Sequence, residues 1–242
     1  MPEILNTSAC NKCAFRSLLF DNLTDDELID LNVNKVEKKY YKKEIVVQQG
    51  EPIKEFLYLK EGLIKLVQKD GMAKEHIISI ARPLNFIGFL SVFSNDKYQY
   101  SISAIEDSVM CFIDLEVLKN TVRNNGVFAL EVLEKISKIS DDIIQFRMMI
   151  DRRQLRGRIA YILVMFAKQV YFNSKFHLPL SRKEIAELID MSTENVIRIL
   201  SEFRRDEIIR IDGSQIVPRE HCAQVGSQLP FRSFQQQRRA FR

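Results

Sequence analysis

Short apolar runs recur across residues 38–115, separated by polar residues and glycines. The runs are rich in Ile, Val, Phe and Tyr, and glycines stand between several of them. Runs of this length bounded by turn residues, about ten residues apart, are typical of the strands of an antiparallel sandwich or barrel. Glycine suits the turns because it adopts positive φ without strain. The pattern predicts an antiparallel β-roll of the jelly-roll type.

A different period follows, with apolar residues spaced alternately three and four apart from Ala129 to Ile150. This is the a/d spacing of a coiled coil and predicts a long helix over residues 126–150. We expect its seam to form a parallel homodimer; the predicted interface consists of Val132, Ile136, Ile139, Ile143, Phe146 and Ile150. The alternative is a helix packed on its own β-roll, a role that we assign instead to a second stripe made of Leu130, Leu133 and Ile144.

Residues 151–154 are polar and interrupt the apolar pattern. Helical patterns then cover residues 155–170 and 180–188, and the second of these begins with Ser181 and Glu184 at capping-box spacing. A third helix is expected to start at Ser192. Apolar runs on either side of Asp212-Gly213 predict a hairpin. Three helices and a hairpin predict a winged helix-turn-helix.

The predicted fold is therefore α+β, with four segments. We expect an effector-sensing β-roll domain over residues 1–125, a dimerisation helix over 126–150 and a winged helix-turn-helix over 151–220. Residues 221–242 contain four arginines, no acidic residue and several glutamines. Such a composition is typical of a disordered tail. Its arginines would either add nonspecific attraction to phosphates or have no role, and we favour the second.

The chain has 242 residues, enough for two domains. It contains no apolar stretch of the roughly 18 residues that a membrane span needs, and its first residues do not resemble a signal peptide. Four scattered cysteines do not make a disulfide scaffold. These features predict a cytoplasmic protein.

The positive charge is concentrated near the C-terminus. Residues 151–242 carry 17 Lys and Arg against 10 Asp and Glu, whereas residues 1–150 carry 19 against 22. The net charges are thus +7 and −3. Clustered basic residues favour nucleic acid, because binding releases its condensed counterions.

Glu194 and Arg198 lie four residues apart and share one face of the third predicted helix. In a helix-turn-helix this helix enters the major groove. Arginine can bind guanine O6 and N7, and glutamate can accept from cytosine N4; Glu194 would also hold Arg198 in place. The alternative is an ordinary surface ion pair. Spacing alone does not decide between them.

The run SRKEIAELIDMSTENVIRIL, preceded by a β-roll and a long helix and followed by a hairpin, resembles the CRP/FNR family of bacterial transcription regulators. TENVIRILSEF is most similar to the Bacteroidetes branch. The resemblance implies a dimer that binds double-stranded DNA and RNA polymerase. It implies base reading by Glu194 and Arg198, with Thr193 where the cAMP-binding members have arginine. The implied phosphate contacts are Arg182, Lys183, Ser192 and Asn195.

The same resemblance places an effector pocket around Phe86, Gly88, Phe89, Leu90, Gln99 and Tyr100. Cyclic-AMP-binding members have a glutamate for the ribose where this chain has Phe89, and an Arg-Ser pair for the phosphate where it has Gln99-Tyr100. A buried phosphate needs a charged or hydrogen-bonding partner. We therefore expect an effector other than cAMP, of unknown identity.

The resemblance also suggests two cofactors, because some members of the family bind an iron–sulfur cluster or haem. Cys10, Cys13 and Cys111 resemble part of the iron–sulfur ligand set of FNR, but Leu19 replaces its third N-terminal cysteine. A cluster normally takes four protein ligands. Haem would need His76, Met148 or Met149, residues that more often fill a core or a dimer seam. We expect no tightly bound cofactor and no metal.

A function of another class is a cupin-like small-molecule-binding domain joined to a helical protein-interaction module. A cupin metal centre needs clustered histidines, and only His76 of the three histidines lies in the predicted β-roll. We found no catalytic motif and predict that the protein is not an enzyme.

Overall fold

The computed structural model describes residues 2–5, 20–71, 74–83, 86–87 and 89–218. The chain divides into two compact units, Met1–Ile143 and Ile144–Arg242. The boundary between them falls inside one long helix, α4 (Gly126–Asp151). No helix among the described residues is both long and apolar enough to cross a bilayer. Cys10, Cys13 and residues 221–242 lie outside the described part of the chain.

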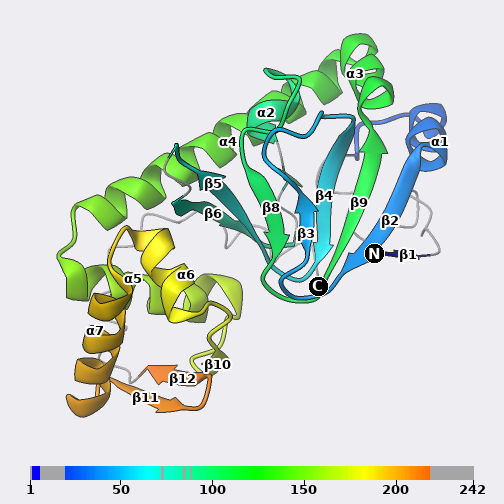
Figure 1. Ribbon diagram of the computed structural model, residues 1–242. Helices are drawn as coiled ribbons and strands as arrows, with labels where there is room; N and C mark the ends of the chain where they lie inside the picture. Colours follow the sequence, from blue (N-terminus) through cyan, green and yellow to red (C-terminus); the bar gives the residue numbers. More distant parts are fainter. Residues whose placement is uncertain (1, 6–19, 72–73, 84–85, 88, 219–242) are drawn as a thin grey trace. The chain divides into compact units, whose positions relative to one another are not determined.

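The first unit contains a β-roll made of two antiparallel sheets (Figure 1). One sheet has the strand order β1-β2-β9-β4-β7, and the other has the order β3-β8-β5-β6. The strands are β1 (Glu3–Leu5), β2 (Lys35–Tyr40), β3 (Ile45–Val47), β4 (Glu55–Glu61), β5 (Ile64–Lys69), β6 (Glu75–Ala81), β7 (Phe86–Ile87), β8 (Ser101–Ala104) and β9 (Ser108–Asp114). The predicted antiparallel roll is confirmed.

The central strands of the first sheet are apolar on both faces. In β4, Leu57 and Leu59 enter the cluster between the two sheets, whereas Phe56 and Tyr58 enter a second cluster with helical residues. Successive side chains of a strand point to opposite faces, so an uninterrupted apolar run marks a strand that is covered twice. The covering helices are α1 (Asp25–Val33), α3 (Leu115–Asn124) and the start of α4.

Gly62 makes the tight turn between β4 and β5. Its φ is +89°, and a Cβ at this position would collide with the backbone of Asp107 and Ser108. Only glycine combines this backbone conformation with so close an approach. The turn brings the Leu63 carbonyl within hydrogen-bonding distance of the Ile105 N–H, at 2.7 Å.

Burial along helix α4 within the protomer differs from what its sequence pattern predicted. Val132 and Ile150 of the predicted dimer seam are buried within the protomer. Ile136 and Ile139 are half-buried against the cluster that contains Val132, and Phe146 packs on Tyr161 at 5.9 Å between ring centroids. Ile143 is also half-buried. The stripe expected to pack inward is exposed instead: Leu130 by 64%, Leu133 by 58% and Ile144 by 57%. Two apolar stripes with helical spacing cannot be ranked by spacing alone.

The second unit contains the end of α4, three further helices and a small sheet. The helices are α5 (Leu155–Met165), which continues as the π-helical turn η3 (Phe166–Val170), α6 (Arg182–Ile189) and α7 (Thr193–Arg205). The last helix of the described residues to be named, α2 (Phe89–Val92), belongs to the first unit. The predicted helices of this region are all present, and the break before Leu155 is the segment between α4 and α5.

The small sheet of this unit has three strands, one more than the hairpin that the sequence predicted. Strands β11 (Ile209–Asp212) and β12 (Gln215–Pro218) pair antiparallel, and β10 (Phe176–His177) adds to the other edge of β12. Asp212 pairs with Gln215, so the connecting residues are Gly213 and Ser214, one position later than predicted. A two-residue strand has too short a pattern to be found from the sequence.

Candidate nucleic-acid interface

The first helix of the helix-turn-helix begins with the expected capping box. The Ser181 N–H donates to the Glu184 carboxylate at 2.8 Å, and the Glu184 N–H donates to the Ser181 hydroxyl at 3.2 Å. The helix ends at Asp190, which adopts the left-handed conformation with φ of 53°. Ser192 then caps α7 by accepting from the Asn195 N–H at 3.3 Å. Sequence and structure agree on where both helices start.

Helix α7 divides into a buried and an exposed face. The buried face consists of Val196, Ile199, Leu200 and Phe203. Glu194, Ile197 and Arg198 are exposed, and Thr193 is half-exposed. Two of the predicted base-reading residues, Glu194 and Arg198, are thus on the outer face at the start of the helix. Ile197 shares this outer face and was not identified from the sequence.

Arg198 is tethered at both ends of its guanidinium. Nη1 donates to Glu202 at 2.6 Å, and Nη2 donates to the Asn195 side-chain oxygen at 3.2 Å. The expectation that Glu194 would hold Arg198 is therefore wrong, because the partners of the guanidinium are Asn195 and Glu202. Glu202 also accepts from Arg156 of α5 at 2.5 Å. The two oxygens of one carboxylate thus connect two arginines.

Glu194 interacts with the start of its own helix. Hydrogen bonds from its backbone N–H and from Ser192 lower the pKa of its carboxyl below the ordinary value of 4.5. The positive end of the helix dipole favours a negative charge at this position. Glu194 is therefore an ionised acceptor with its side chain fully in solvent.

The predicted phosphate contacts lie at the starts of both helices. Lys183 is exposed and forms an ion pair with Glu187 at 3.6 Å. Arg182 is half-buried, and this burial lowers the pKa of its guanidinium, which remains charged at neutral pH. Asn195 donates its backbone N–H to Ser192. Backbone N–H groups and basic side chains at helix starts suit anionic phosphates.

Arg158 of α5 was missed by the sequence reasoning. Its Nη1 donates to the carbonyls of Ile189 and Asp190, at 3.1 and 3.3 Å, and its Nε donates to the carbonyl of Arg153 at 3.1 Å. These carbonyls belong to the helix-turn-helix turn and to the segment after α4. No local pattern signals this contact, because the residues are about 30 positions apart in the chain.

The described part of the predicted effector pocket is small. Gly88 lies outside the described residues, and the side chains of Phe86, Phe89 and Leu90 are not described. Gln99 is exposed, and its side chain donates to the Lys97 carbonyl at 3.1 Å. Tyr100 is buried, which raises the pKa of its hydroxyl, although the neighbouring Ser91 opposes the shift. Gln99 and Tyr100, which occupy the Arg-Ser position, therefore lie in different surroundings, the first in solvent and the second in the protein interior.

The candidate cofactor residues have local partners. Cys111 is buried in the apolar cluster of the first sheet beneath α1 and α3. The His76 ring lies 3.3 Å from Asp70, and the Met149 sulfur accepts from Arg153 at 3.2 Å. Within the described ranges no group of three His, Cys, Asp or Glu residues is arranged to hold a metal. Three cysteines also fall short of the four ligands of a cluster, so they do not fit that cofactor.

Comparison with known proteins defines the class. Residues 37–125 match the cyclic nucleotide-binding domain, and residues 157–220 match the Crp-like helix-turn-helix domain. This combination defines transcription regulators with a cyclic-nucleotide-binding-like β-roll and a DNA-binding helix-turn-helix. The chain belongs to the CRP/FNR family. Its relatives are regulators and not enzymes, which favours this class over the cupin-like alternative.

Individual relatives are distant but align along most of the chain. The transcriptional activator protein Anr of Pseudomonas protegens is 23% identical over 93% of this chain and 95% of its own length. The transcriptional activator protein FnrL of Cereibacter sphaeroides is 22% identical over 90% and 89%. The structure of FixK2 from Bradyrhizobium japonicum superposes with a TM-score of 0.70 at 19% identity, covering 79% of this chain and 96% of FixK2. CRP/FNR regulators bind DNA as dimers.

Proposed function

We propose that this protein is a homodimeric, sequence-specific transcription regulator that binds an inverted-repeat operator through α7. Residues 1–125 sense an effector, 126–150 form the dimerisation helix and 151–220 bind DNA. The observation that carries the proposal is the outer face of α7, where an ionised Glu194 and the exposed Arg198 lie just after the capped start of the second helix of the helix-turn-helix. The net charge of +7 on residues 151–242 supports a polyanionic partner.

Base reading is assigned to Arg198 and Glu194, with Thr193 beside them. Arg198 is already charged, and its tethers to Glu202 and Asn195 keep the guanidinium on the reading face. These exposed hydrogen bonds are weak enough to exchange for guanine O6 and N7. Glu194 accepts from cytosine N4. Arg182, Lys183, Ser192 and Asn195 contact phosphates and set the register.

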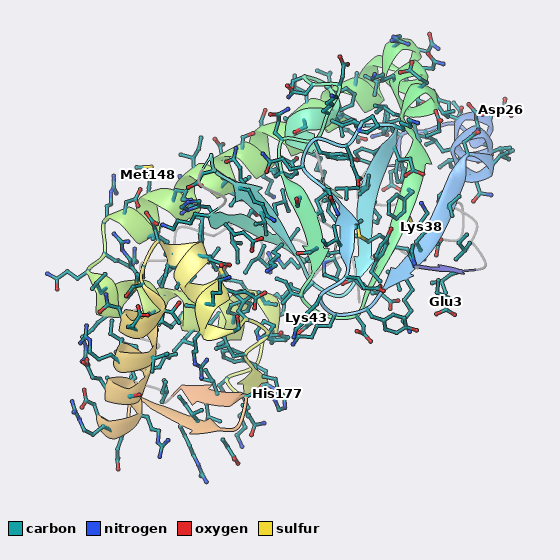
Figure 2. All side chains as sticks on the ribbon, in the orientation of Figure 1. Glu3, Asp26, Lys38, Lys43, Met148 and His177 are labelled. Carbon is teal, nitrogen blue, oxygen red and sulfur yellow. The ribbon has the colours of Figure 1, made fainter. Side chains whose placement is uncertain are left out.

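Dimerisation is assigned to the exposed stripe of α4. This stripe consists of Val127, Leu130, Leu133, Ile144 and Met148, all at least 41% exposed in the single chain. Figure 2 shows Met148 projecting away from the helix. The exposed apolar residues form two groups on this 26-residue helix, separated by Ser137, Ser140 and Asp141. Such groups are costly to leave in water and suit a parallel partner helix. The inward stripe is occupied within the protomer.

The effector is assigned to the β-roll, and it is not cAMP. The segment from Phe89 to Tyr100 contains no arginine or glutamate, and its one basic residue, Lys97, is exposed. A buried cyclic phosphate would have no charged side chain from this segment. Effector binding would shift the packing of α4 and thereby the spacing of the two reading helices. The proposed function requires neither haem nor an iron–sulfur cluster. After DNA, RNA polymerase is the second macromolecular partner of the protein in this proposal.

Selection of bound sequences from a random duplex pool by the full-length protein tests this function. We expect an inverted repeat whose half-site centres lie about 10 base pairs apart, one helical turn. Arg198→Ala should reduce binding to this selected duplex and relax the preference at one G·C pair in each half-site. Arg123→Ala, on α3 of the first unit, is the matched control and should behave as wild type. Recovery of no preferred sequence would contradict the proposal.

A further inference from the structure

Arg156, near the start of α5, binds two acidic side chains from the end of α7. Its Nη1 donates to Glu202 at 2.5 Å, and its Nη2 donates to Asp206 at 3.0 Å. The same guanidinium lies over the Phe203 ring, 5.0 Å from the ring centroid. A planar guanidinium with several fixed donors suits such a double contact, which a lysine could not reproduce. These three contacts fix the position of the Arg156 side chain on α7.

Glu202 is shared between two arginines, and each arginine binds one of its two oxygens. Oε2 accepts from Arg156, whereas Oε1 accepts from Nη1 of Arg198 at 2.6 Å. The Glu202 side chain is only 19% exposed, so solvent screens its contacts less than those of a fully exposed carboxylate. A carboxylate with both oxygens available commonly forms two parallel hydrogen bonds with one guanidinium. Because Arg156 occupies Oε2, Glu202 forms a single hydrogen bond with Arg198 instead of this stronger pair.

We propose that Arg156 is a positioning residue on α5 that keeps Arg198 available for DNA by occupying one oxygen of Glu202. This inference rests on the proposed DNA-reading role of α7. Arg198 exchanges its contact with Glu202 for guanine O6 and N7, so every additional hydrogen bond to Glu202 in the free protein lowers the affinity for guanine. In this role Arg156 acts through Glu202 and contacts no base.

A clamp that only joins α5 to α7 is the alternative role for Arg156. The contacts with Asp206 and Phe203 suit such a clamp, and neither residue is a hydrogen-bond partner of Arg198. The two roles differ in how they depend on Glu202. Loss of Arg156 removes a clamp whether or not residue 202 is charged. It sequesters Arg198 only while residue 202 is a carboxylate, because a neutral side chain forms no ion pair.

Base discrimination by the full-length protein tests the role of Arg156. Fluorescence anisotropy measures binding to the selected duplex and to a second duplex in which A·T replaces the G·C pair read by Arg198 in both half-sites. Arg156→Ala should lose about threefold of the wild-type preference per half-site, a value within the range of one surface ion pair. Addition of Glu202→Gln to Arg156→Ala should restore the preference. Asp206→Asn is the control, because it removes the other acidic partner of Arg156 and leaves Glu202 bound; it should keep the wild-type preference.

The outcomes separate this inference from the function on which it rests. If Arg156→Ala weakens binding to both duplexes equally, Arg156 only attracts phosphates, and its positioning role is overturned. The positioning role is also overturned if Glu202→Gln does not restore the preference. A wild-type protein that prefers neither duplex overturns the DNA-reading role itself. Each preference is a ratio of two affinities of one preparation, so a partly unfolded fraction cancels from it.

Discussion

At the scale of single residues, α7 combines three chemistries on one face. Arg198 is a donor held by Glu202 and Asn195, Glu194 is an ionised acceptor, and Ile197 is apolar. Donor, acceptor and methyl group are also the features that distinguish base pairs in the major groove. In the proposed function, the donor and the acceptor on this face are the groups that bind base edges.

Glu194 leads to a prediction about pH. Hydrogen bonds at the helix start lower the pKa of its carboxyl below 4.5. A lowered pKa means that the carboxylate, the form that accepts from cytosine, persists until the pH falls below the ordinary glutamate range. The ratio of wild-type to Glu194→Gln affinity for the selected duplex should stay constant from about pH 8 to about pH 6. A ratio that falls within this window would show a raised pKa and contradict the assignment.

At the scale of elements, starts of helices were predictable and long-range contacts were not. Ser181, Glu184 and Ser192 are local signals, and the structure has the caps that they predict. The bonds from Arg158 to the turn after α6 join distant segments, so no window of sequence contains them. Helix α4 has two sets of apolar residues, and which of them is buried depends on how the β-roll covers the helix. These two kinds of information come only from tertiary structure.

Arg158 and Arg156 form a natural pair for a stability test. Arg158 is half-buried and donates to three backbone carbonyls, whereas Arg156 is exposed and pairs with Glu202 and Asp206. Removal of a donor from partly buried carbonyls costs about 1–3 kcal/mol, whereas an exposed ion pair is screened by solvent and contributes little. Arg158→Ala should therefore lower the free energy of unfolding in urea more than Arg156→Ala. Equal effects would contradict the role of Arg158.

The stripe on α4 leads to a prediction about assembly. Leu133→Glu adds a charge to a residue that is 58% exposed in the single chain, so folding should be unaffected. In a dimer the same charge would be buried without a partner, which is strongly unfavourable. Sedimentation should show a monomer for Leu133→Glu and a dimer for wild type. Ile29→Glu, on α1, is the control and should remain dimeric; a dimeric Leu133→Glu would exclude this stripe.

At the scale of the whole molecule, the sequence predicted the class of transcription regulator but not the effector that it senses. The β-roll, the long helix and the helix-turn-helix each have a recognisable periodicity or capping pattern, and both family domains match. The residues of the predicted effector pocket come from separate segments, Phe86 to Leu90 and Gln99-Tyr100. Hydrophobic periodicity in the sequence does not show which side chains from separate segments come together in a pocket. Tyr100, for example, is buried beside Ser91, whereas its neighbour Gln99 is exposed.

The first unit leads to a prediction about ligands. Gln99 and Tyr100 occupy the position of the phosphate-binding pair of the cAMP-binding members, and neither is charged at neutral pH. Calorimetry should therefore detect no binding of cAMP at micromolar concentrations. As a control, the same preparation should bind the selected duplex. Micromolar affinity for cAMP would contradict the assignment of the pocket.

The bond between Arg198 and guanine is the central claim, and replacement of one atom tests it most directly. In the selected duplex, 7-deazaguanine in place of the guanine read by Arg198 removes the N7 acceptor and leaves base pairing intact. Hydrogen bonds to charged groups contribute about 1.5–3 kcal/mol, so wild type should lose at least about tenfold in affinity. Arg198→Ala should bind both duplexes equally. An equal loss by both proteins, or no loss by wild type, would contradict the account.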